Sequence, residues 1–133
     1  MNITTVEGIG PVNAARLSEQ GITTVEALLE AGAARKDRRQ LAEATELSET
    51  LLLGWVNRAD LMRVPGVGEE YSDLLENSGV DTVKELRRRN PENLHEAMQV
   101  VNGEKRLVRR FPGKASVEGW IDAAKELPPK VTY

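Results

Sequence analysis

Two halves of this chain share one residue pattern at a constant offset of 58 positions, without a gap. Glycines, aliphatic residues and threonines coincide at the same places of both halves. The matched pairs are Gly8 with Gly66, Gly10 with Gly68, Leu17 with Leu75, Gly21 with Gly79, Thr24 with Thr82, Val25 with Val83 and Leu28 with Leu86. Such a repeat indicates one supersecondary unit used twice. We therefore expect a single domain over residues 1–133, with a first repeat at 1–62 and a second at 63–133.

Each repeat has the punctuation of a series of short helices. Pro11 suits a first helical turn, Gly21 suits a helix end, and Thr24 can cap the helix that follows it. Aliphatic residues recur at helical spacing between these signals. The sequence predicts an all-α fold with helices over residues 11–20, 25–32, 38–45, 48–62, 69–78, 82–89, 91–101, 105–110 and 116–127.

A second alignment, at an offset of 65, joins the ends of the two repeats. It pairs Trp55 with Trp120, which predicts that both are core residues and that the second repeat gained about seven residues, within a basic insertion around 90–115. We expect the helix at 116–127 to fold back beside the first glycine turn and close a pseudo-twofold domain. The terminal residues 130–133 would then pair in extended form with residues 3–6, a short terminal β pairing.

Composition excludes several classes of function. The 133 residues contain no cysteine and no apolar run of the roughly 20 residues that a membrane span needs. The N-terminus lacks the pattern of a signal peptide, which favours a cytoplasmic location. There is no phosphate loop, nucleophile elbow or cluster of side chains at metal-ligand spacing. We therefore expect a non-enzymatic protein with no cofactor, no metal and no membrane partner.

The net charge of −3 conceals a segregation of charge. Residues 84–114 carry nine basic and four acidic side chains, whereas residues 60–76 carry five acids and one arginine. An anionic partner would therefore meet a basic patch and not a uniformly basic protein.

The two glycine turns carry a recognisable motif. Residues 6–17 read VEGIGPVNAARL and residues 64–75 read VPGVGEEYSDLL, each with a hydrophobic residue between two glycines and a leucine seven residues after the second glycine. This pattern resembles the helix-hairpin-helix motif, and two copies in one chain resemble the tandem helix-hairpin-helix domains of DNA repair and recombination proteins. The whole chain resembles the small bacterial DUF4332-type proteins of uncharacterised function.

The resemblance implies that backbone N–H groups of the turns face DNA phosphates, an arrangement that glycine and a helix N-terminus favour physically. It assigns nucleic-acid contacts to the turns and the residues beside them: Gly8, Ile9, Gly10, Val12 and Asn13 in the first repeat, and Gly66, Val67 and Gly68 in the second. The same turn is also the shortest way to join two packed helices. Glu69 and Glu70 favour this second interpretation, because they repel a phosphate where they stabilise the helix.

Five arginines complete the candidate interface: Arg87, Arg88, Arg106, Arg109 and Arg110. The last three have helical spacing, although a solvated helix face would have the same pattern. The function expected is sequence-independent binding of double-stranded DNA through the first turn and the basic stretch. The alternative is a protein-interaction or scaffold module with an acidic protein partner. A monomer is expected in preference to a dimer that exchanges the C-terminal helix.

Overall fold

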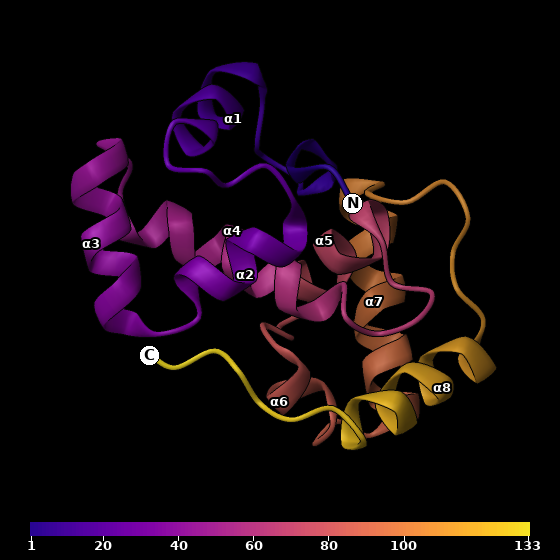
Figure 1. The fold of residues 1–133 in the computed structure, drawn as a ribbon. Coiled ribbons are helices and arrows are strands. Elements are labelled where there is room, and N and C mark those ends of the chain that lie inside the picture. Colours follow the sequence, from indigo (N-terminus) through magenta and orange to yellow (C-terminus); the bar gives the residue numbers. More distant parts are fainter. The chain divides into compact units, whose positions relative to one another are not determined.

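The computed structural model describes residues 1–133, and the chain is all-helical, as the sequence predicts (Figure 1). The only β-type pairing is an isolated bridge between Asn2 and Thr24. The chain forms two compact units. Unit 1 comprises Met1–Asp60 with Lys130–Tyr133, and unit 2 comprises Leu61–Pro129.

Unit 1 contains a short 3-10 helix and four α-helices. These are η1 (Ile3–Thr5), α1 (Pro11–Ser18), α2 (Val25–Gly32), α3 (Arg35–Thr45) and α4 (Glu49–Leu61), whose last residue, Leu61, belongs to unit 2. The helices begin where the sequence supplies caps: Thr24 Oγ1 accepts a hydrogen bond from the Ala27 amide at 3.0 Å. Its core is aliphatic around one tryptophan, with Trp55 only 1% exposed.

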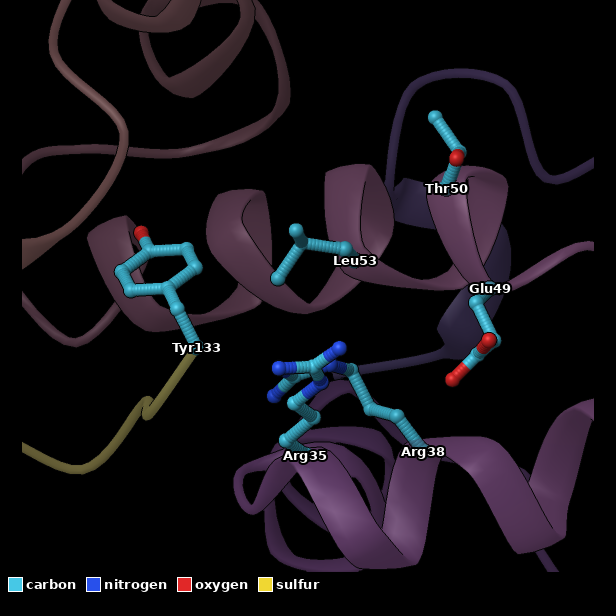
Figure 2. Close-up of a pocket in the computed structure, with 6 residues that line it drawn as sticks. All are labelled: Arg35, Arg38, Glu49, Thr50, Leu53 and Tyr133. Atoms are coloured by element: carbon cyan, nitrogen blue, oxygen red, sulfur yellow. The ribbon is translucent and has the colours of Figure 1, made fainter.

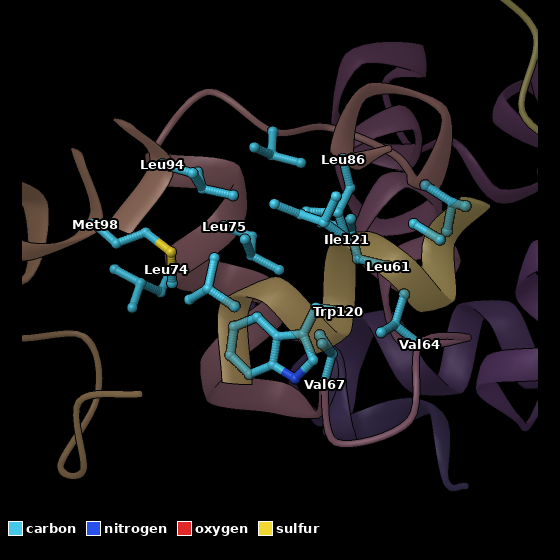
Figure 3. Close-up of a cluster of buried hydrophobic side chains, with 14 of the residues drawn as sticks. Leu61, Val64, Val67, Leu74, Leu75, Leu86, Leu94, Met98, Trp120 and Ile121 are labelled. Atoms are coloured by element: carbon cyan, nitrogen blue, oxygen red, sulfur yellow. The ribbon is translucent and has the colours of Figure 1, made fainter. Parts of the chain in front are cut away.

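Unit 2 contains four α-helices in the corresponding order. These are α5 (Glu69–Asn77), α6 (Val83–Leu86), α7 (Pro91–Lys105) and α8 (Lys114–Lys125). Figure 3 shows its core, where leucines of α5, α6 and α7 surround Trp120 and Ile121 of α8. Burying each such side chain contributes about 1.5–3 kcal/mol. Trp120 is 6% exposed, so the prediction that both tryptophans are core residues is confirmed.

The same backbone hydrogen bonds recur in the two units at the 58-residue offset. The Ile9 amide donates to Val6 O at 3.1 Å, and the Val67 amide donates to Val64 O at 3.0 Å. One turn further on, matching amides of α1 and α5 each donate at 2.9 Å to the glycine that caps the helix, Gly10 or Gly68. The repeated sequence therefore builds a repeated local structure.

Glycine is required at the first position of each turn. The φ angle is +95° at Gly8 and +90° at Gly66, in a region that residues with a Cβ rarely adopt. A Cβ on Gly8 would also lie 3.0 Å from Trp55 Nε1, and one on Gly66 would lie 3.3 Å from Trp120 Nε1. Each turn therefore rests on the tryptophan of its own unit.

The predicted place of the last helix is wrong. Helix α8 contacts α6 and α7, and its Trp120 lies at the second turn, not the first. The corresponding place at Gly8 is taken by Trp55 of α4. Because α4 already supplies the first turn with its partner, residues 116–127 have no missing element to replace.

The predicted terminal β pairing is also wrong. Residues Ile3–Thr5 form the 3-10 helix η1, whose N-cap Asn2 accepts from the Thr4 amide. The C-terminal residues run along another part of unit 1, where the Thr132 amide donates to Ala33 O at 2.9 Å. Arg38 holds this tail with Nη2 on Thr132 O, so its backbone is bonded without any strand.

The predicted helix at 105–110 is absent, because α7 extends to Lys105 and stops there. Arg106 caps it in the left-handed conformation, with φ +51°. Asn102 then turns the chain, since its side-chain oxygen accepts from the Val108 amide at 3.0 Å. A membrane-spanning helix needs both length and an apolar composition, and no helix of this structure combines the two.

Candidate nucleic-acid interface

The first glycine turn presents a row of unused backbone donors. Gly8 and Gly10 are exposed, Ile9 is buried beneath them, and Gly10 is the N-cap of α1 without any side-chain cap. The amides of Gly8, Gly10, Val12 and Asn13 make no hydrogen bond within the protein, and Val12 is 68% exposed. Such amides at a helix start attract an anion.

The second turn has the same backbone and a different charge. Val67 is buried, Gly68 caps α5 without a side-chain bond, and the amides of Gly66 and Gly68 are unused. However, exposed Glu69 and Glu70 occupy the first turn of α5. Their carboxylates neutralise the positive end of the helix and repel a phosphate approaching it.

The basic segment is brought to the second turn by side-chain anchors. Residues 105–110 run along α5 from its end to its start: Lys105 Nζ donates to Asn77 Oδ1 at 2.9 Å, and the Tyr71 hydroxyl donates to Arg110 O at 2.8 Å. Beyond them, His95 Nε2 lies 3.1 Å from Pro112 O. The segment is therefore held in place although it is not helical.

Two of the predicted arginines consequently flank the second turn. The side chain of Arg109 is 96% exposed, and its Nε lies 4.0 Å from Glu70 Oε1. Arg110 and Arg106 are exposed and make no ion pair. Because the segment is irregular, the prediction that these three arginines share one face of a helix is wrong. They gather beside α5 for a different reason, which is the anchoring through Tyr71.

Arg87 and Arg88 lie at another place, directly after the short helix α6. Neither makes a side-chain bond, whereas Arg89 pairs with Glu85 at 3.1 Å and donates to Gly79 O at 2.7 Å. Gly79 follows the C-terminal end of α5, and Arg109 lies at the N-terminal end. Arg109 and Arg110 therefore lie at the N-terminal end of this helix, whereas Arg106, next to the Lys105–Asn77 bond, lies toward its C-terminal end, as Arg87 and Arg88 do.

A pocket in unit 1 offers a second candidate site (Figure 2). Its volume is about 300 Å³, and its lining is Arg35, Arg38, Glu49, Thr50, Leu53 and Tyr133. Burial lowers the pKa of Arg38, which is 3% exposed and donates Nη1 to Gly32 O and Ala33 O at 2.9 and 2.8 Å. Since these carbonyls and Thr132 O occupy its donors, Arg38 secures the tail and is not free for a ligand.

Sequence reasoning missed the residues that place the basic segment. Tyr71 and Asn102 act through single hydrogen bonds to the backbone of residues 108–110. The tyrosine ring also packs on Trp120, with the ring centroids 5.1 Å apart. A tyrosine directly after a glycine turn was a signal, but its partner lies 39 residues away and has no local pattern.

The fold and the site define an all-α chain with two glycine turns, each followed by a helix and supported by a tryptophan. Comparison with protein families identifies the family of this chain. Residues 7–127 match the domain of unknown function DUF4332, and the chain belongs to this family. Neither the curated proteins nor the solved structures contain a significant match.

Proposed function

We propose that this protein is a non-enzymatic module that binds double-stranded DNA without sequence preference, and that its glycine turns act as helix-hairpin-helix elements. One observation carries the proposal: the amides of Gly8, Gly10, Val12 and Asn13 in the first turn are unused, and no carboxylate stands in the first turn of α1, the nearest in sequence being the exposed Glu7 before Gly8. Phosphate oxygens are the acceptors that such a turn suits.

The basic side chains supply the second part of the proposed interface. Arg106, Arg109 and Arg110 are exposed, and neutralising several phosphates would release counterions and make binding salt-dependent. Arg87 and Arg88 add charge at the end of α6. In this proposal Arg109 and Arg110, beside the second turn, contact the phosphates. The amides of that turn do not, because Glu69 and Glu70 repel a phosphate there.

A specific observation favours a second function. The second turn keeps the same backbone although two glutamates beside it would repel a phosphate. This is expected of a turn that only joins two helices and binds no anion. In that case the glycine turns only join helices, and the basic segment meets an acidic protein. We also propose that the protein is cytoplasmic and monomeric. A mass in solution equal to one chain supports the monomer, and a dimer mass contradicts it.

Fluorescence anisotropy of a labelled short duplex tests the proposed function. We expect binding that weakens steeply between about 50 and 200 mM salt. Arg109→Glu with Arg110→Glu should weaken it strongly at the lower salt concentration. Lys36→Glu with Arg39→Glu is the matched control, because both are exposed cations on α3 outside the interface and the pair changes the net charge by the same amount. Absence of binding at low salt contradicts the proposal and leaves the protein-interaction function.

A further inference from the structure

Each unit has another repeated turn, which follows α1 in unit 1 and α5 in unit 2. It contains Gly21 with φ +78° in unit 1 and Gly79 with φ +92° in unit 2. The residue after each glycine donates its amide to the leucine carbonyl four residues before that glycine, at 3.0 Å in unit 1 and 2.9 Å in unit 2. The two turns therefore have the same backbone, and the side chains around them can be compared position by position.

An arginine fills the space beside this turn in unit 2. Arg89 donates Nη2 to Gly79 O at 2.7 Å and Nε to Glu85 Oε1 at 3.1 Å. A Cβ on Gly79 would lie 3.2 Å from the same Nη2 atom. The guanidinium of Arg89 therefore lies directly against the turn.

Alanine occupies both corresponding positions in unit 1. At the 58-residue offset, Ala31 corresponds to Arg89, and Ala27 corresponds to its ion-pair partner Glu85. A Cβ on Gly21 would meet no atom within 4 Å, and Gly21 O accepts no hydrogen bond within the protein. Unit 1 therefore repeats the turn without the side chain that covers it in unit 2.

A groove of about 390 Å³ lies at this place in unit 1. Its volume is within the range of roughly 300–1,000 Å³ that ligand-binding pockets have. Its lining combines polar and apolar side chains of the turn, α2 and α3, and includes Gln20, Ile22, Ala31, Asp37, Gln40 and Leu41. Ile22 and Leu41 are buried, whereas Asp37 and Gln40 are exposed. The groove thus has an apolar surface with a carboxylate and an amide beside it.

The charge at the groove favours a cationic ligand. Asp37 is the ionisable residue of its lining, and none of the cations near it on α3 lines the groove. Arg38 is turned to the C-terminal tail, Arg39 lies 3.6 Å from Glu49, and Lys36 is exposed. A carboxylate on an open apolar surface suits a side chain with an aliphatic stem and a planar cationic end.

We propose that this groove binds an arginine side chain of a partner protein, in the place that Arg89 occupies in unit 2. The aliphatic stem packs on Ile22 and Leu41, and the guanidinium pairs with Asp37. Arginine is among the residues that contribute most to binding at protein interfaces. The inference does not rest on the proposed DNA binding, which uses other residues.

The experiment titrates the unmodified protein with N-acetyl-arginine methylamide and follows the backbone amides by NMR. We expect saturable shifts at Gly21, Ile22 and Gln40. The citrulline compound of the same length is the control, because a neutral urea replaces its guanidinium. It should bind about two- to five-fold more weakly, as expected for the loss of one exposed ion pair.

Two variants test the groove itself. Ala31→Arg places a long side chain in the groove and should abolish the shifts. Ala115→Arg is its matched control, because Ala115 is an exposed alanine of α8 in unit 2 and the change in charge is the same. Asp37→Asn should weaken binding of the arginine compound about two- to five-fold. Glu43→Gln, at an exposed acid of α3 outside the lining, should leave it unchanged.

Thermal unfolding shows whether Ala31→Arg is folded, and Asp37→Asn decides the matter if it is not. The proposal is overturned if the arginine compound causes no saturable shift or if the citrulline compound binds equally well. It is also overturned if the shifts persist in folded Ala31→Arg or if Asp37→Asn binds as tightly as the unmodified protein.

Discussion

The two glycine turns have the same backbone and opposite surroundings. Gly8 and Gly66 share a positive φ, a buried aliphatic neighbour and a tryptophan behind the turn. The helix after the first turn opens with Pro11 and Val12, and the helix after the second opens with two glutamates. What is repeated in this chain is therefore what the fold requires, and charge is where the two turns differ.

The two units also differ in the basic side chains that lie beside the helix after each turn. The seven extra residues of unit 2 lengthen α7 and lead into the segment that carries Arg106, Arg109 and Arg110 beside α5. Unit 1 has no such segment beside α1. The first turn thus has unused amides and no arginine segment beside it. The second turn has arginines beside it, together with the carboxylates of Glu69 and Glu70.

The largest effect on stability is expected where the two turns are alike. Gly8→Ala should lower the free energy of unfolding by about 1–3 kcal/mol, because it forces a Cβ into a positive φ and against Trp55. Gly66→Ala should cost a similar amount, somewhat less because its contact is longer. Chemical denaturation measures both.

Gly10→Ala and Gly68→Ala are the matched controls for that pair. Both residues have negative φ and no atom within 4 Å of an added Cβ. They should lose at most a few tenths of a kcal/mol beyond the loss of an N-cap preference. Equal losses at all four glycines would contradict the role given to the positive φ and the tryptophan contact.

A smaller effect is expected where the units differ. Asn13 and Tyr71 stand at corresponding positions, and only Tyr71 holds an insertion. Tyr71→Phe removes the hydroxyl that donates to Arg110 O, so stability should fall by about 0.5–1.5 kcal/mol. Amide exchange in residues 106–111 should accelerate, while exchange in unit 1 stays unchanged. A uniform change across both units would contradict the local anchoring.

The smallest effect on stability is expected at two exposed ion pairs. In one pair the acidic residue begins a helix, and in the other the basic residue does. Glu49 begins α4 and lies 3.6 Å from Arg39, whereas Lys114 begins α8 and donates to Glu92 at 2.7 Å. That hydrogen bond lowers the pKa of Glu92 and raises the pKa of Lys114. Ionised Glu92 therefore contributes to the stability of the folded state above the pKa of about 4.3 that it has in the unfolded chain. This contribution is lost as the pH falls through the lower pKa that Glu92 has in the folded state.

Lys114→Met should therefore raise the pKa of Glu92 to its ordinary range. NMR titration of the Glu92 carboxyl carbon measures this directly. Stability near neutral pH should barely change, because both side chains are exposed. A Glu92 pKa that stays lowered in the variant would show that the lysine is not its cause.

Local signals in the sequence were sufficient to predict the all-α fold. Glycine, proline and threonine mark the helix boundaries at Gly10, Thr24 and Gly68, and the resemblance of the whole chain to DUF4332-type proteins is confirmed. Both tryptophans were assigned correctly to the core from their equivalent places in the two repeats.

Errors arose where long-range contacts decide the structure. The stretch 105–110 has helical spacing, but a side-chain bond from Asn102 ends the helix before it. The placement of residues 116–127 failed because the sequence does not show that Trp55 already fills the first turn. The position of the arginines beside α5 depends on the bonds of Tyr71 with Arg110 and of Lys105 with Asn77, which join residues far apart in the sequence and which no local pattern encodes.

The central claim is that charge after the turn decides whether its amides can hold a phosphate. Exchanging the corresponding residues tests it most directly: Val12→Glu in one variant, and Glu70→Val in the other, each titrated against a labelled duplex at low salt. We predict that Val12→Glu weakens binding at least ten-fold and that Glu70→Val strengthens it. Unchanged affinity in both variants would contradict the account and leave the glycine turns as structural joints between helices.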